Sequence, residues 1–153
     1  MFLRPLHAIA LPILVLAGCA SSSSDVADQS DRYAAKEVAL RHMITEFPPG
    51  DGYCFVITDP EDSDRLITAL SGFATPVIRM AQVSMDEGGR DCDSQTGSLV
   101  IRLGVEINSI DGRYATLTTE LDAGPEGGVW YTVILRKQDG RWIVDSTVVE
   151  AHS

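Results

Sequence analysis

The sequence predicts one α+β domain, in which N-terminal helices pack on a curved antiparallel sheet of about four strands. Three observations lead to this prediction. Apolar residues recur at helical spacing near the beginning of the chain, they alternate with polar residues toward its end, and turns that contain glycine separate the alternating stretches. The 153 residues, 44% of them hydrophobic, suit a single packed domain, which we place at residues 31–153.

The first helix is predicted at residues 31–47. Leu40, Met43 and Ile44 fall on one face of this helix, and Pro48 follows its end. The apolar face indicates that the helix packs on the sheet.

A short buried strand and a second helix follow. Residues 53–58 are aromatic and β-branched, as in a buried strand. Leu66 and Leu70 have helical spacing after Ser63, which can cap a helix. Residues 77–85 fit either a strand or an irregular segment.

The sheet is predicted from the alternating stretches, at residues 99–107, 114–121, 129–137 and 141–149. Asp111-Gly112 and Asp139-Gly140 are the turn signals of two hairpins.

The last of these hairpins carries a resemblance. Residues 131–144 read as an aromatic strand, a charged turn with glycine, and then Trp142-Ile143-Val144, and this pattern resembles the final hairpin of NTF2-like and cystatin-like domains. The resemblance implies an α+β fold and, for an NTF2-like domain, a concave pocket.

Four side chains are candidates for the interior of such a pocket: Tyr33, Tyr53, Tyr114 and Glu106. Packing in the core is the alternative role for the tyrosines. Because such folds serve both enzymes and binding proteins, the resemblance assigns no reaction.

The first residues predict a secretory signal. Arg4 precedes an apolar run at residues 6–17, which is shorter than the roughly 20 residues of a membrane-spanning helix. Residues 16–19, Leu-Ala-Gly-Cys, then resemble the lipobox of bacterial lipoproteins.

The lipobox resemblance implies that residues 1–18 are a signal peptide and that Cys19 becomes a lipidated N-terminus. The lipid would comprise a thioether-linked diacylglyceryl group and an amide-linked acyl chain such as palmitate, which anchor the chain in a membrane. Ala20, in place of an Asp, favours the periplasmic face of the outer membrane. Residues 19–30 are rich in serine and predict a flexible tether. The alternative is an ordinary cleaved signal that releases the domain into the periplasm.

The charge of the chain excludes one class of partner. Lys and Arg total 12 against 22 Asp and Glu, which gives a net charge of -10. Binding to nucleic acid needs clustered basic residues, and the sequence has no such cluster.

Two cysteines remain beyond the lipobox, Cys54 and Cys92. Because the periplasm is oxidising, we expect a disulfide between them. Two separate thiols are the alternative. The absence of a CxxC motif disfavours a metal site.

The sequence predicts no catalytic residue, no metal and no cofactor, because it lacks the usual motifs for them. His42 is expected to face solvent. Two acidic clusters, at residues 59–64 and 86–93, raise a calcium hypothesis, but their spacing is not that of an EF-hand. A helix start and a polar loop explain them better.

These features favour a non-enzymatic, lipid-anchored envelope protein that binds an envelope partner, with Trp130 and Trp142 as its partner surface. A small-molecule binder or enzyme with an NTF2-like pocket is the alternative. A third hypothesis is an immunity or inhibitor protein with a basic target.

Overall fold

The computed structural model describes residues 23–50, 53–79, 84–86, 89–91, 99–124 and 127–152. The predicted signal peptide, Cys19 and Cys92 lie outside these residues. None of the helices in the described ranges has the length and apolar character needed to cross a membrane.

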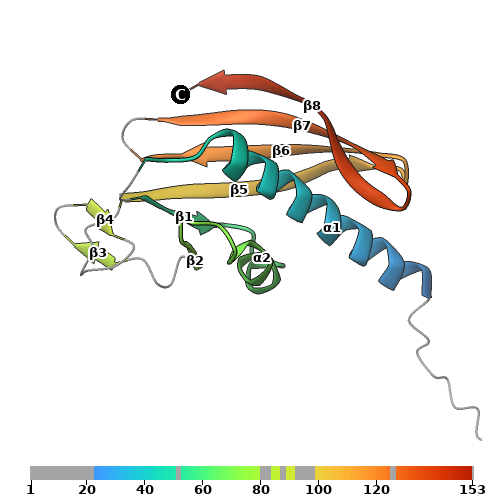
Figure 1. Cartoon of the computed structure of the whole chain (residues 1–153), viewed down its shortest axis with the longest axis horizontal. Helices are drawn as coiled ribbons and strands as arrows, with labels where there is room; N and C mark the ends of the chain where they lie inside the picture. The colour runs from blue at the N-terminus through green and yellow to red at the C-terminus, as the bar shows by residue number, and fades with distance from the viewer. Residues whose placement is uncertain are drawn as a thin grey trace, which may run out of the picture.

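Helices and strands follow one another in the order α1 (Ser23–Glu46), β1 (Tyr53–Ile57), α2 (Ser63–Leu70), β2 (Val77–Arg79), β3 (Ser84–Asp86), β4 (Gly89–Asp91), β5 (Leu99–Ile110), β6 (Tyr114–Asp122), β7 (Gly128–Gln138) and β8 (Arg141–His152). Six strands form one continuous sheet in the order β2-β1-β5-β6-β7-β8, and β4 joins β3 to β5 at its side (Figure 1).

The prediction of an antiparallel sheet of about four strands is therefore wrong. The sheet is mixed, because β1 runs parallel to both β2 and β5. The physical reason is the β1–α2–β2 crossover, since two parallel strands need a long connection that returns the chain to the same end of the sheet. Only β5 to β8 form the predicted antiparallel meander, and the fold remains α+β.

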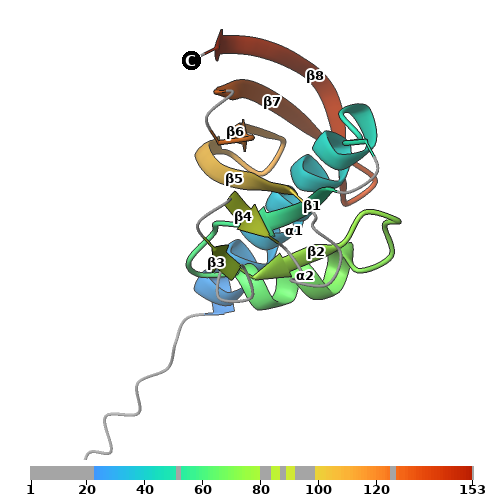
Figure 2. The same cartoon turned by 90° about the vertical axis from the view of Figure 1, so that its left-hand side faces the viewer.

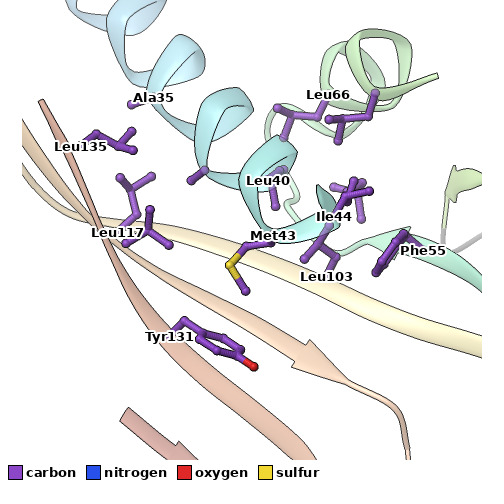
Figure 3. Packing of buried hydrophobic residues seen from close by; sticks show 14 of the residues in the cluster. Ala35, Leu40, Met43, Ile44, Phe55, Leu66, Leu103, Leu117, Tyr131 and Leu135 are labelled. Atoms are coloured by element: carbon purple, nitrogen blue, oxygen red, sulfur yellow. The ribbon is translucent and has the colours of Figure 1, made fainter. Parts of the chain in front are cut away.

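Helix α1 fills one face of the sheet, which we call the inner face. Figure 2 shows the sheet curving around this helix. The small residues Ala35 and Ala39 have no exposed surface, and so the helix lies close to the strands. Met43 and Leu40 point toward the strands in Figure 3 and are also fully buried. Burial of each such large side chain contributes about 1.5–3 kcal/mol.

The same core joins both helices to both parts of the sheet. Its members from the strands alternate along each strand, as side chains that share one face must. They include Phe55 and Ile57 of β1, Leu103 of β5, Leu117 of β6, Val133 and Leu135 of β7, and Trp142 of β8, together with Leu66 and Leu70 of α2.

The helix α1 begins earlier than the sequence predicts. It starts at Ser23 rather than at Asp31, so residues 23–30 of the predicted flexible tether are helical. Asp31 of this helix pairs with Lys137 of β7, which fixes the helix to the sheet.

Both hairpin turns form at the predicted glycines. Asp111 accepts hydrogen bonds from the backbone N–H groups of Arg113 and Tyr114, and Gly112 has a φ of 84°. Asp139 and Gly140 both have positive φ, as in the type I′ turn that suits the twist of a hairpin.

Candidate interaction surface

The outer face of the sheet is the face of β5 to β8 opposite α1, and no helix of the described residues covers it (Figure 2). In β6 and β7 the residues that alternate with the core positions have partly exposed side chains. The outer face carries Glu106, Tyr114, Thr116, Thr118, Glu120, Trp130, Thr132, Ile134, Arg136, Ile143, Ser146 and Val148.

Trp130 is the largest side chain of the outer face. Its ring lies along the strand over Gly128, because a Cβ atom at this glycine would be 3.5 Å from the indole Cη2. Across the sheet Trp130 stands opposite Glu120 of β6, which in turn stands opposite Gly104 of β5. The ring therefore extends along β7 toward Gly128, with Glu120 as its cross-strand neighbour.

Trp142 lies on the other side of the sheet. It is opposite Lys137 on the inner face and is only 5% exposed, with the Lys137 ammonium 5.1 Å from its ring centre. The structure does not bring the two tryptophans together, and only Trp130 is available to a partner.

A buried ion pair connects α1 to the end of β1. Lys36 Nζ lies 2.7 Å from Asp59 Oδ2 and 3.1 Å from Asp62 Oδ2. The other oxygen of Asp59 accepts hydrogen bonds from the backbone N–H groups of Glu61 and Asp62. These contacts explain the acidic residues 59–62 as part of a folded turn.

The pKa values in this ion pair shift toward the charged forms. Burial alone would lower the pKa of Lys36, but its hydrogen bonds to Asp59 and Asp62 outweigh burial and raise that pKa. Burial alone would raise the pKa of Asp59, but the hydrogen bond from Lys36 and those from the backbone lower it. Both groups stay charged at neutral pH, so Lys36 is a structural cation rather than a nucleophile or base.

The sequence-based reasoning missed Lys36. Its position in the sequence indicates burial, because Lys36 lies between Ala35 and Ala39 on the face of the helix that the apolar residues share. A lysine on such a face needs a buried carboxylate, and Asp59 is the first acidic residue after the strand beneath it.

A shallow groove of about 450 Å³ runs between α1 and α2, lined by Tyr33, Asp64, Arg65, Thr68 and Ala69. The Arg65 guanidinium lies 3.8 Å from the centre of the Tyr33 ring, and the Tyr33 hydroxyl donates to the Arg65 carbonyl oxygen. Burial, followed by the charge of Glu37, raises the pKa of this hydroxyl. Most polar groups at the groove are therefore already bound to one another.

The structure separates the remaining candidates for a pocket. Tyr114 and Glu106 lie on the outer face and are exposed, and Tyr53 begins β1 with a partly exposed side chain. His42 does not simply face solvent, because its Nε2 shares a 2.8 Å hydrogen bond with Thr147 Oγ1 of β8. These residues do not converge on a common point.

Within the described ranges, no group of three or more His, Cys, Asp or Glu side chains is placed to hold a metal ion. The first acidic cluster is engaged as described above, and Asp64 pairs with Arg79 at 2.8 Å. In the second cluster Asp86 ends β3 and Asp91 ends β4, whereas Glu87 and Asp93 lie outside the described residues.

Cys54 is fully buried beside Val56 and Val100, on the side of β1 opposite the main core. Its sulfur is in a disulfide. The predicted partner, Cys92, lies outside the described residues, and so the pairing stays a prediction.

Comparison with protein-family models, with curated proteins and with solved structures gives no match. The described residues define an α+β domain in which a helix packs on one face of the sheet and no described helix covers the other face.

Proposed function

We propose that this protein is a lipid-anchored envelope lipoprotein whose domain is a non-enzymatic binding module, and that the outer face of the sheet receives its partner. The open outer face is the observation that carries this proposal. It presents Trp130, Ile134, Ile143 and Val148 on adjacent strands, without a helix of the described chain above them. Aromatic and aliphatic side chains gathered on an open surface are typical of interaction sites.

The lipid anchor is supported by the lipobox resemblance of residues 16–19, and its position has a consequence for α1. Residues 20–22 separate Cys19 from Ser23, and the four Cα–Cα steps between them span at most about 14 Å. A lipid on Cys19 would thus hold the start of α1 close to the membrane. The C-terminal end of β8 lies at the opposite end of the molecule in Figure 1, on the side that we expect to point into the periplasm.

The alternative, a small-molecule pocket on the concave side of the sheet, has less support. Side chains of α1, among them Met43 and Leu40, fill the inner face and have no exposed surface. The groove beside Tyr33 is open and lies outside the sheet.

A crosslinking pull-down of the lipidated protein from its own envelope tests the proposal. We expect one saturable protein partner, whose yield falls about tenfold or more with Trp130→Ala because a central aromatic residue dominates most interfaces. Thr68→Ala on α2 is the matched control, since Thr68 lies exposed on the helical side, and it should leave the yield unchanged. Equal retention by both variants would contradict the proposal, as would turnover of a small substrate in the absence of any partner.

A further inference from the structure

Strand β8 forms one edge of the sheet. It is the last strand in the order of the sheet, paired on one side with β7 and, among the described residues, with no strand on the other side (Figure 1). Such an edge leaves backbone N–H and C=O groups that pair readily with another strand.

Two exposed valines mark this edge. Val148 is 52% exposed on the outer face, opposite Thr132, and Val149 is 50% exposed on the inner face, opposite Tyr131. Phe47 adds an exposed ring on the inner face, since it contacts Tyr131, the residue opposite Val149, with ring centres 4.6 Å apart. A partner that docks flat on one face covers only one of the valines, whereas a strand added beside β8 covers both.

Two β-bulges, each with an acidic extra residue, lie on either side of the two valines in β8. Tyr131 and Trp130 pair with Val149 and Ala151, so Glu150 is an extra residue in β8. Ile134 and Leu135 pair with Ser146 and Val144, so Asp145 is the extra residue of a second bulge. The regular stretch of the edge, residues 146–149, therefore lies between two carboxylates.

Among the described residues, Asp145 forms an ion pair with a basic side chain and Glu150 does not. Asp145 pairs with Arg136 at 3.3 Å, and both side chains are exposed. Glu150 accepts a hydrogen bond from the Thr132 hydroxyl, but no Lys or Arg of the described residues pairs with it. The edge thus retains negative charge next to its valines.

The charges argue against a second copy of this chain as the added strand. Symmetric antiparallel pairing centred on Val148 sets Glu150 opposite Ser146 and so beside Asp145, and this contact occurs twice. Like charges brought together across a strand pair destabilise it, whereas Lys or Arg at the same positions stabilises it. The net charge of -10 also steers basic partners toward the domain.

We propose that β8 binds its partner by strand addition, and that the added strand is a short extended segment of a protein with apolar residues between two basic ones. This inference rests on the proposed binding function and names the mode of binding and the chemistry of the partner.

Selection from a library of random twelve-residue peptides tests the proposal, with the full processed protein held in detergent as bait. We expect enriched peptides with Lys or Arg on both sides of an apolar stretch. An enriched peptide should slow hydrogen exchange at residues 146–149 and should bind Val148→Lys at least about tenfold more weakly. Thr68→Lys adds the same charge to the exposed surface of α2, away from the edge and from the outer face, and it should change affinity by less than about twofold.

A second variant tests the charges. Replacing both Asp145 and Glu150 by Lys should shift the selection toward acidic peptides. Peptides without basic residues, peptides that leave exchange at residues 146–149 unchanged, a chain that dimerises through β8, or no enrichment at all would each overturn strand addition. If enriched peptides lose affinity with Trp130→Ala but not with Val148→Lys, strand addition fails while the proposed binding function stands.

Discussion

Lys36 Nζ on α1 lies 2.7 Å from Asp59 Oδ2 at the end of β1, and both side chains are almost completely buried. This pair fixes the helix that fills the inner face to the turn that begins α2. A buried pair of this kind contributes little beyond an apolar replacement of both partners, but the loss of one partner leaves an uncompensated charge in the interior.

Lys36→Met should therefore destabilise the domain by about 3–5 kcal/mol, because Asp59 and Asp62 lose their cation. Urea unfolding followed by circular dichroism measures the change. Glu37→Gln is the control, since Glu37 pairs with Arg41 on the surface of the same helix and its loss should cost less than about 1 kcal/mol. Equal small losses in both variants would show that the buried pair does not support the fold.

The stability should depend on pH through Asp59. Because the folded-state pKa of Asp59 is lowered, its contribution is present above the unfolded-state pKa of about 4 and is lost as the pH falls through the folded-state value. The difference in free energy of unfolding between the wild type and Asp59→Asn should thus shrink from pH 7 toward pH 2.5. A difference that is independent of pH would contradict this assignment.

The inner face should tolerate no added volume. Ala39→Phe should destabilise the domain by about 1–3 kcal/mol or more, since α1 leaves no space at this position. Leu117→Ala should cost about 2–5 kcal/mol by the opposite effect, a cavity. Thermal unfolding measures both, with Thr116→Ala on the outer face as a near-neutral control. A stabilised Ala39→Phe would reveal an empty pocket on the inner face.

Cys19→Ser should abolish acylation and leave the precursor uncleaved, because the lipobox needs the thiol of Cys19. Mass spectrometry and membrane fractionation measure the outcome. Normal processing and membrane retention of this variant would refute the lipobox assignment.

Cys54 and Cys92 should together be two hydrogens lighter than two free thiols in the oxidised protein. Closure of the loop between them should stabilise the domain by about 4 kcal/mol in the chain-entropy model. Intact mass before and after reduction tests the bond, and alkylation of both thiols in the unreduced protein would exclude it.

Local patterns in the sequence predicted the strands of the meander and the second helix well. The alternation in residues 99–107 and the Asp-Gly turns are local signals, and β5, β6 and their hairpin follow them. The place of β1 between β2 and β5 was not predicted, because it depends on pairing between Tyr53 and Leu99, which lie far apart in the chain. No local pattern carries such long-range information.

The two tryptophans show the same limit at the candidate site. Both stand in the last hairpin, but pairing with Lys137 directs Trp142 to the inner face, while Trp130 faces outward beside Thr132. Hydrophobic character alone identified them as surface candidates, and only the register of the strands separates their roles.

Site-specific photocrosslinking in the native envelope tests the open outer face most directly. A photoreactive residue at Ser146, exposed on the outer face of β8, should give one discrete crosslinked protein, and the same residue at Thr68 on α2 should give none. A crosslink from Thr68 to the same protein, or none from Ser146, would contradict the account.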